Sequence, residues 1–246
     1  MQIIGSGFIF IRNISSTNTF ASELVKTGRV SEGTIIHTDY QSAGRGQPGN
    51  RWHSAKGRNL LFTVILFPRL KAGEQFFLSM AVSAGICSFL KKYIPDPQIK
   101  WPNDIYTGTK KIAGILIENS LQGDMIEHSI VGIGLNINQQ RFPRAIPNPI
   151  SLSRVTGKKF DTDKCLREIA QSLDEKYKIL QSGDKKGIYE EYISLLYRYN
   201  EWHYYRDKAG IFRGMIVSVK PSGLLVIKKE EGTLDEYSFR EVDYLR

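Results

Sequence analysis

Residues 39–52 read DYQSAGRGQPGNRW, which places Gly44, Gly46 and Gly49 within six residues and Arg45 between the first two. An apolar run at 34–36 precedes this stretch and LLFTVIL at 60–66 follows it, so the pattern predicts a loop between two strands. Glycine lets main-chain N–H groups approach an anion, and arginine offers a planar fork for carboxylate or phosphate. The loop is a candidate anion site, although a plain surface loop explains this stretch alone equally well.

The three glycines also satisfy the spacing G-x-G-x-x-G. A dinucleotide site with that spacing needs a helix to open at the third glycine, whereas NRWH at 50–53 does not resemble a helix start and another strand follows. The His-Arg-Asp and Asp-Phe-Gly motifs of protein kinases are absent from the sequence, and so is the P-loop motif. The loop therefore belongs to another class of site.

Three motifs follow downstream: KWPND at 100–104, KIAGILIE at 111–118 and GIGLNIN at 132–138. With Ser-Thr-Asn at 16–18 and the Gly-Arg-Gly loop, they resemble the biotin protein ligases, the enzymes that attach biotin to carrier proteins. The resemblance covers essentially the whole chain, in order and at fitting spacings. The pairing of the Gly-Arg-Gly loop with KWPND is the specific part, since each motif alone is weak.

The resemblance implies a reaction in two steps, in which ATP converts biotin to biotinyl-5′-AMP and a lysine of a biotin carboxyl carrier protein then displaces AMP. It implies Mg²⁺ held mainly by the phosphates, and no protein-ligated metal. It assigns catalysis to Lys100 and Arg45. It assigns biotin binding to Ser16, Thr17, Asn18, Gln41, Gly44, Arg45, Gly46, Gln47, Lys100 and Gly114. It assigns ATP or adenylate binding to Arg45, Arg51, Trp52, Asn103, Lys111 and Asn136.

Several of these residues also have a physical reason for a binding role, and a purely structural role is the alternative. The polar residues 15–18 supply N-cap chemistry for a predicted helix, and the same helix N-terminus offers N–H groups to a polar ligand. Gln41 supplies an amide that suits the ureido ring of biotin. Lys100 and Trp101 alternate on a short strand, so one can face a site and the other the core, although most lysines are solvated.

Gly132 and Gly134 put flat backbone beside Asn136. This arrangement leaves room for an adenine ring, with Asn136 on its edge; plain strand packing with a bulge is the alternative. One position departs from the family pattern: many members carry arginine where this chain has Gln47. A neutral amide cannot pair with a phosphate as an ion, and Arg45 and Arg51 are the candidates to compensate.

Composition narrows the class of protein. The chain has 246 residues, 41% of them apolar, and a net charge of +9 from 34 Lys and Arg against 25 Asp and Glu. No apolar run near the ~20 residues of a membrane span and no signal peptide are evident. Cys87 and Cys165 lie far apart, which favours a reduced, cytoplasmic protein, and four scattered histidines show no ligand spacing. The basic excess suits a nucleotide and an acidic protein partner, with nucleic acid as the alternative.

The predicted fold is α+β. Residues 1–199 form a mixed sheet flanked by helices, of the class II synthetase-like kind that the resemblance implies. Strands are expected at 3–11, 34–36, 60–66, 99–101, 111–118 and 126–137, and helices from 20, over 73–93, over 161–181 and over 185–197. Residues 200–246 form a small SH3-like barrel with strands at 211–219, 224–227 and 233–239. Its aromatic residues Trp202, Tyr204, Tyr205 and Phe212 are expected to be buried against the first domain.

Two rival functions remain. A lipoate ligase or octanoyltransferase shares the fold but lacks the pairing of Gly-Arg-Gly with KWPND. A biotin-responsive DNA-binding repressor carries a helix-turn-helix domain before the catalytic motifs, and Ser16 lies too near the start for one. We therefore expect a carrier protein as partner, no sequence-specific nucleic acid, no membrane, and a monomer or weak homodimer.

Overall fold

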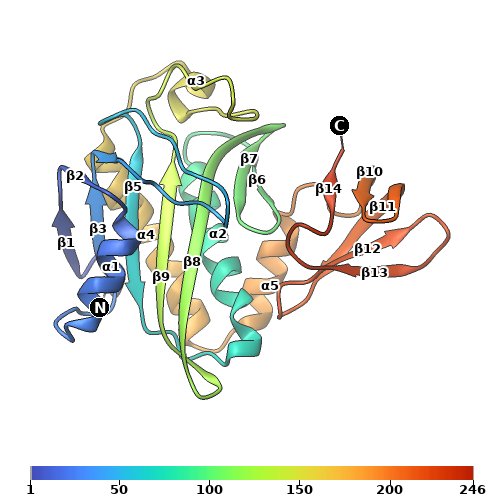
Figure 1. Ribbon diagram of the computed structural model, residues 1–246, viewed down its shortest axis with the longest axis horizontal. Coiled ribbons are helices and arrows are strands. Elements are labelled where there is room, and N and C mark those ends of the chain that lie inside the picture. Colours follow the sequence, from blue (N-terminus) through green and yellow to red (C-terminus); the bar gives the residue numbers. More distant parts are fainter. Residues whose placement is uncertain (1, 246) are drawn as a thin grey trace.

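The computed structural model describes residues 2–245, and its centre is a seven-stranded mixed sheet with the order β1-β3-β5-β9-β8-β7-β6 (Figure 1). The strands are β1 (Gly7–Phe10), β3 (Thr34–Thr38), β5 (Leu60–Leu66), β6 (Pro97–Lys100), β7 (Asp104–Thr107), β8 (Lys110–Gln122) and β9 (Met125–Leu135). β1 and β3 are parallel, and every other neighbouring pair is antiparallel. A two-stranded ribbon of β2 (Asn13–Ile14) and β4 (Tyr40–Gln41) lies beside it. The expected mixed sheet is confirmed.

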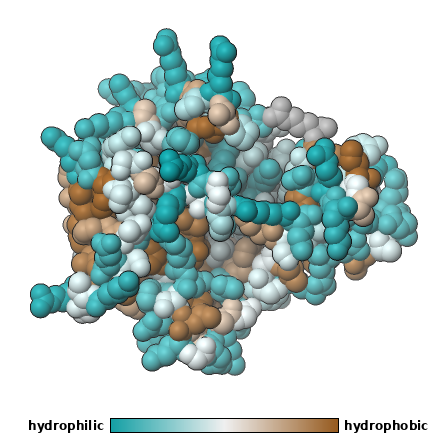
Figure 2. Space-filling view, in the orientation of Figure 1, coloured by the Kyte–Doolittle hydropathy of each residue, from teal (hydrophilic) through white to brown (hydrophobic). Residues whose placement is uncertain are grey.

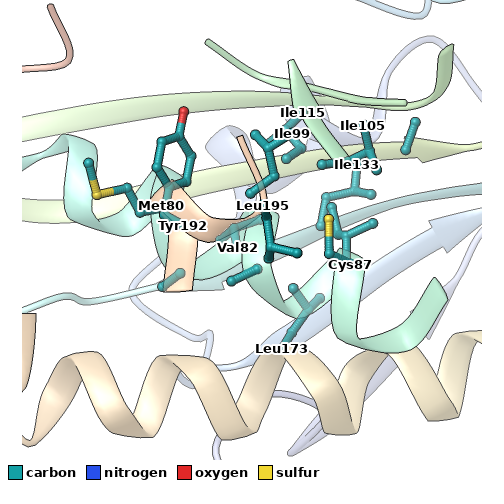
Figure 3. Packing of buried hydrophobic residues seen from close by; sticks show 14 of the residues in the cluster. Met80, Val82, Cys87, Ile99, Ile105, Ile115, Ile133, Leu173, Tyr192 and Leu195 are labelled. Atoms are coloured by element: carbon teal, nitrogen blue, oxygen red, sulfur yellow. The ribbon is translucent and has the colours of Figure 1, made fainter. Parts of the chain in front are cut away.

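Helices cover the sheet on both faces. In Figure 1, α1 (Thr17–Lys26) lies in front, and α2 (Phe76–Leu90), α4 (Thr162–Gln181) and α5 (Lys185–Ser194) lie behind; α3 (Leu152–Thr156) crosses one end. β5 is buried at every position, as its unbroken apolar sequence predicts for a strand covered on both faces. The main core lies between the sheet and the three rear helices (Figure 3). Met80 and Cys87 belong to it, as expected.

Helix boundaries follow local chemistry. Ser16 caps α1 and Asp161 caps α4, each through its side chain, as the sequence predicts. The helix expected over 185–197 ends earlier, at Ser194, because residues 195–197 form a turn that bridges to β6: Ile99 donates to the carbonyl of Leu195 at 2.7 Å. The helix expected over 73–93 divides into a 3₁₀ turn, Ala72–Glu74, and α2.

The stretch Ala72–Leu90 reaches 19 residues and is long and apolar enough to cross a membrane by length and composition. This corrects the expectation that no apolar run approaches that length. Within the molecule, however, 72% of its apolar window is buried. Packing against the sheet and against α4 and α5 therefore explains its apolar sequence.

The C-terminal lobe, residues 202–244, is a five-stranded antiparallel sheet with the order β13-β12-β11-β10-β14. Its strands are β10 (Trp202–Asp207), β11 (Gly210–Val219), β12 (Leu225–Lys229), β13 (Leu234–Tyr237) and β14 (Asp243–Tyr244). The sequence missed β10 and β14. The expected small antiparallel β lobe is present. Among the described residues, β13 and β14 do not pair with each other, so the sheet is not closed into a barrel.

The junction between the lobe and the main sheet uses other aromatic residues than expected. Trp202 and Tyr204 are 39% and 57% exposed, so their predicted burial is wrong, whereas Tyr205 is fully buried. Instead, Trp101 donates through Nε1 to the carbonyl of Gly223 at 2.8 Å, and the rings of Tyr197 and Tyr244 stack at 6.4 Å between centroids. The lobe is therefore tied to the strand that carries Lys100.

Candidate functional site

The glycine-rich loop folds as a short hairpin. Arg45 and Arg51 form a β-bridge, and Asn50 donates to the carbonyl of Gln47 at 2.8 Å. Gly49 has φ +83° at the third position of this turn, after Pro48 at the second. That pattern is the sequence signature of a type II turn. The hairpin lies over the sheet and forms one wall of a cavity.

The cavity measures about 320 Å³ and gathers residues from distant parts of the sequence. They come from the N-terminus of α1, the hairpin, β6, β7, β8, β9 and the C-terminal lobe. Figure 2 shows a recessed surface bordered by hydrophilic residues between the main body and the lobe. Five cationic side chains and two carboxylates line the cavity: Arg45, Arg51, Lys100, Lys111 and Arg240, with Asp104 and Asp243. This excess of positive charge suits an anionic ligand.

Most of the sequence-predicted site residues meet here. The residues that line the cavity are Ser16, Thr17, Asn18, Gln41, Arg45, Gly46, Gln47, Arg51, Trp52, Lys100, Asn103, Lys111 and Gly114. Two do not line it. Gly44 lies at the base of the hairpin, where Trp52 donates to its carbonyl and an added Cβ would lie 2.6 Å from the carbonyl oxygen of Trp52, and Asn136 is buried.

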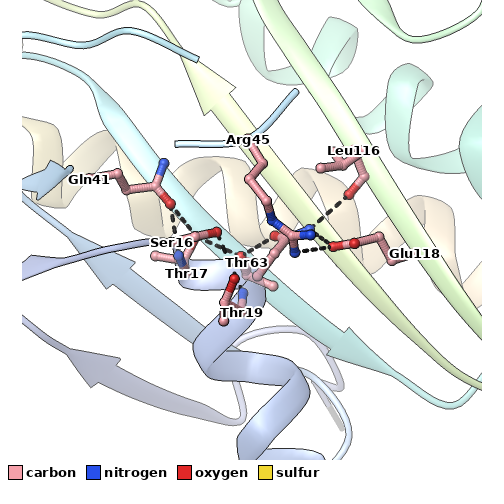
Figure 4. Close-up of polar contacts among 9 residues, drawn as sticks. Ser16, Thr17, Thr19, Gln41, Arg45, Thr63, Leu116 and Glu118 are labelled. Atoms are coloured by element: carbon pink, nitrogen blue, oxygen red, sulfur yellow. Dashed lines mark hydrogen bonds and ion pairs between the residues drawn. The ribbon is translucent and has the colours of Figure 1, made fainter. Parts of the chain in front are cut away.

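A hydrogen-bonded network fixes the α1 side of the cavity (Figure 4). Gln41 accepts through Oε1 from the main-chain N–H of Thr17 at 2.8 Å. The hydroxyl oxygen of Thr63 in β5 lies 2.7 Å from Thr17 Oγ1 and 2.7 Å from Asn18 Oδ1, which accepts. Sequence reasoning missed Thr63, because an isolated threonine in an apolar strand carries no signal. Within residues 2–245, Gln41 Nε2 has no hydrogen-bond acceptor, so it can serve a ligand.

Arg45 is held by Glu118. Its Nη2 lies 2.7 Å from Glu118 Oε2, and Asn18 donates to the same carboxylate oxygen at 2.8 Å. The arginine and the glutamate side chains are 43% and 39% exposed. An ion pair of that exposure contributes less than about 1 kcal/mol of stability. An anionic ligand can therefore take Arg45 from Glu118 at small cost.

Lys100 lies at the opposite wall. Its Nζ is 4.7 Å from the ring centroid of Tyr244 and 5.2 Å from that of Tyr106, and it donates to Tyr106 Oη at 3.4 Å. Burial lowers the pKa of Lys100, and Asp104 opposes that shift. A partly desolvated ammonium interacts more strongly with a nearby anion than a solvated one does.

Two other predicted residues have structural partners. Lys111 pairs with Asp104 at 2.6 Å, and Asn103 donates through Nδ2 to the carbonyl of Ile115 at 2.6 Å. Asn103 thereby closes the end of the β7–β8 pairing. Both side chains still line the cavity, so their roles toward a ligand stay predictions.

Gly132 and Gly134 line the cavity, but Asn18 and Trp52 occupy the space next to their backbone. β9 pairs regularly there without a bulge, but an added Cβ on Gly132 would lie 2.2 Å from Asn18 Oδ1, and one on Gly134 would lie 2.3 Å from the indole of Trp52. The Nε1 of Trp52 is buried without a hydrogen-bond partner. The glycines therefore make room for the chain's own indole and carboxamide.

Sequence reasoning also missed the contribution of the C-terminal lobe. Phe239, Arg240, Val242, Asp243 and Tyr244 all line the cavity. Arg240 has φ +74°, in the left-handed region. No local pattern marks these residues, because they reach the site only through the docking of the lobe.

The cysteines take no part in the site. Both are buried and free, and burial raises the pKa of the Cys87 thiol to about 12 and that of Cys165 to about 11. Neither forms a thiolate at neutral pH, so neither is a nucleophile.

Comparison with known proteins decides the family. The sequence profile of the biotin/lipoate A/B protein ligase family matches residues 10–136. The chain belongs to this family. It is 29% identical over 241 residues to the bifunctional ligase/repressor BirA of Bacillus spizizenii, covering 96% of this chain and 74% of that protein. It is 27% identical over 200 residues to the biotin–[acetyl-CoA-carboxylase] ligase of Paracoccus denitrificans, covering 78% of this chain and 82% of that one.

The fold agrees with this family assignment. The biotin protein ligase of Aquifex aeolicus, solved in complex with biotin and ATP, superposes with a TM-score of 0.78 at 29% identity, covering 98% of this chain and 99% of that one. The resemblance to biotin protein ligases that the sequence motifs indicated is thus confirmed, and this ligase belongs with them within the family.

Adding one methyl group should have different effects at Gly44 and at Gly46. Gly46 does not have a positive φ, and its added Cβ meets Asn50 only at 3.4 Å, whereas the Cβ of an alanine at position 44 would lie 2.6 Å from the Trp52 carbonyl. We expect Gly44→Ala to displace Trp52, so that a bound adenylate is hydrolysed several-fold faster. The adenylate half-life in Gly46→Ala should equal that in the unchanged chain. Rapid-quench measurement of adenylate half-life checks this. Equal half-lives in both variants would contradict the role of Gly44.

Proposed function

We propose that this ligase activates biotin as biotinyl-5′-AMP and transfers the biotinyl group to a lysine of a biotin carboxyl carrier protein. The supporting observation is that Arg45, Lys100 and Arg240 line the same cavity as Gln41 and the N-terminus of α1. Uncharged polar groups and cations in one cavity match a ligand with a neutral polar ring and a carboxylate. The cations also suit the phosphates of ATP.

In the first step, an oxygen of the biotin carboxylate attacks the α-phosphorus of ATP. A new P–O bond forms, the bond to the β-phosphate breaks, and pyrophosphate leaves with the electron pair. The ammonium of Lys100 offsets the negative charge that develops around the α-phosphorus, and burial strengthens this interaction. Arg45 exchanges Glu118 for the bound anion and, with the hairpin, keeps water from the mixed anhydride.

In the second step, the carrier lysine attacks the acyl carbon as a free amine. A C–N bond forms, the C–O bond to the phosphate breaks, and AMP leaves with the electron pair while the amine loses a proton to solvent. The same cations then stabilise the phosphate of AMP as it departs. Adenylation is necessary because a carboxylate alone is a poor acyl donor.

The cavity fits a Mg²⁺ ion held by phosphates better than one held by protein. Among residues 2–245, no group of three or more His, Cys, Asp or Glu is placed to ligate a metal. Asp104 is paired with Lys111, and Glu118 with Arg45. The ion would neutralise phosphate charge, with Asp243 as the remaining carboxylate that lines the cavity.

The test is pyrophosphate release from ATP with biotin, lipoate or octanoate as the acid. We expect release with biotin at a rate at least tenfold above that with the other two acids. Preferential release with lipoate or octanoate would assign the chain to the lipoate branch of its family. No release with any acid would refute a ligase of this kind.

DNA binding gives a separate prediction, because one similar protein is named a ligase and repressor. Mixing the chain with arbitrary duplex DNA should give only weak association that falls steeply between 50 and 200 mM salt, roughly as counterion release predicts for a basic surface. Fluorescence anisotropy at several salt concentrations, with and without biotin and ATP, measures it. A sequence-specific footprint that biotin strengthens would contradict the proposal.

A further inference from the structure

A second cavity of about 400 Å³ adjoins the first and differs from it in charge. Its lining is shared among the start of α2, the outer part of β8 and two turns of the C-terminal lobe, and it contains no ionisable side chain. Its polar residues are amides and hydroxyls: Gln47, Gln75, Ser79, Ser83, Asn103, Asn119, Ser222 and Ser238. We call this cavity the neutral groove. No side chain that lines it could neutralise the charge of an anion such as pyrophosphate.

The neutral groove and the cationic cavity share walls. Gln47, Pro102, Asn103 and Phe239 line both of them, and so do Trp101 and Ile115. Trp101 directly follows Lys100 in β6 and its turn. A group held in the neutral groove therefore lies next to the place where the acyl adenylate would form.

The groove contains an unpartnered polar group. Ser83 is fully buried in α2, and its hydroxyl has no hydrogen-bond partner although the residue lines the groove. A buried hydroxyl without a partner costs stability, so such a group indicates an external partner. Ser79 lies one helical turn earlier and lines the same groove with part of its surface exposed.

The groove also borders a free strand edge. β7 pairs with β8 only as far as Gly114, after which Asn103 accepts from the N–H of Ile115 at 2.9 Å and donates to its carbonyl at 2.6 Å. Hydrogen-bonding direction alternates along an antiparallel strand, so Ile117 and Asn119 turn their main-chain groups to that same side. β9 pairs with the opposite edge of β8, but on this edge no described strand pairs beyond Gly114, and β8 extends past β6 and β7 in Figure 1.

We propose that the neutral groove binds the main chain of the acceptor protein beside its target lysine, in extended form along the outer edge of β8. The proposal rests on the function proposed above. An open strand edge supplies N–H and C=O groups to a peptide backbone, and amide and hydroxyl side chains supply the rest. The absence of charge selects an acceptor lysine whose sequence neighbours are uncharged, because a buried charge without a partner is costly.

The test compares variants that fill or alter the groove. Ser79→Leu fills it from a partly exposed helix position, Ser83→Ala removes the unpartnered hydroxyl, and Ser194→Leu is a matched control on the exposed surface of α5, outside the groove lining. Three reactions are measured for each: pyrophosphate release with biotin and ATP, trapping of the adenylate by hydroxylamine, and transfer to a biotin carboxyl carrier domain.

We expect Ser79→Leu to raise KM for the carrier domain roughly tenfold, the scale of one or two lost hydrogen bonds, and Ser83→Ala to raise it a few-fold. Pyrophosphate release and hydroxylamine trapping should stay within twofold, because neither uses the groove, and Ser194→Leu should match the unchanged chain. An unchanged carrier KM in Ser79→Leu overturns the proposal, and so does an equal loss in all three reactions. No adenylate from the unchanged chain overturns the proposed function and this inference with it.

A carrier-side experiment tests the charge preference without relying on the folding of any ligase variant. Carrier domains with glutamate on either side of the acceptor lysine should be modified at least tenfold more slowly than the parent domain. Ser79→Lys in the ligase should restore part of that rate for the glutamate carriers alone. Equal rates for the parent and glutamate carriers would refute an uncharged subsite.

Discussion

Replacing Lys100 with alanine should reduce adenylate formation about 10²- to 10³-fold, the scale of losing one preorganised charge at a reacting centre. The ammonium lies against Tyr106 and Tyr244 at the cavity wall, so its loss removes a charge from the reacting end without disturbing the core. We expect folding stability to be unchanged, since burying a charge costs free energy that alanine does not incur. Biotin-dependent pyrophosphate release and a denaturation curve measure the two effects.

The rate of adenylate formation should fall as the pH rises, because it depends on the charged form of Lys100. Burial lowers the pKa of Lys100, so its ammonium form is lost at a lower pH than that of a solvated lysine. Pyrophosphate release that depends on the charged form should therefore fall as pH rises through this lowered pKa, and it should be full below it. Lys100→Ala should lose this decline. Lys110→Ala, at an exposed position of β8, is the control and should keep both rate and profile. Pyrophosphate release at the unchanged rate in Lys100→Ala would refute the assignment.

Removing the C-terminal lobe, residues 202–246, should abolish carrier transfer and reduce adenylate formation roughly 10²-fold as well. The deletion takes away Arg240 and Tyr244 from the cavity wall. It also removes the carbonyl of Gly223 that accepts from Trp101 Nε1. The deletion would expose the apolar face of Trp101, and the strand carrying Lys100 would lose its support. From the sequence alone, removal of the C-terminal domain is expected to reduce carrier transfer more than adenylate formation.

Point variants separate two roles of the lobe: the contacts that its residues make with a ligand in the cavity, and its support of the fold. Arg240→Ala should keep the fold and raise KM for ATP about tenfold, as expected for one charge-assisted contact to phosphate. Arg213→Ala is the matched control, because Arg213 pairs with Glu230 on the exposed face of the same lobe. Both steps are measured in each variant and in the truncation. Full carrier transfer by a soluble truncated chain would contradict the role of the lobe.

The local chemistry of the sequence determined most of the secondary structure. The cap at Ser16, the cap at Asp161 and the unbroken apolar run of β5 each depend on neighbours within a few residues, and the structure confirms all three. The motifs likewise indicated most residues of the cavity, because each motif places its polar side chains at the end or edge of a predicted strand. Lys100 reaches the cavity with its ammonium, whereas Trp101 is buried and donates to the lobe, although part of Trp101 also lines the cavity.

Only the tertiary structure decided what depends on distant packing. The bridge between residues 195–197 and β6 depends on the open edge of β6, which no property of α5 reveals. The covering of Gly134 by Trp52 and the pairing of Arg45 with Glu118 join residues 82 and 73 positions apart. Tyr244 and Arg240 reach the site because the lobe docks on Trp101, and the neutral groove exists because β7 is shorter than β8. Sequence patterns report each element's own preferences, whereas these features depend on the relative placement of two or more elements.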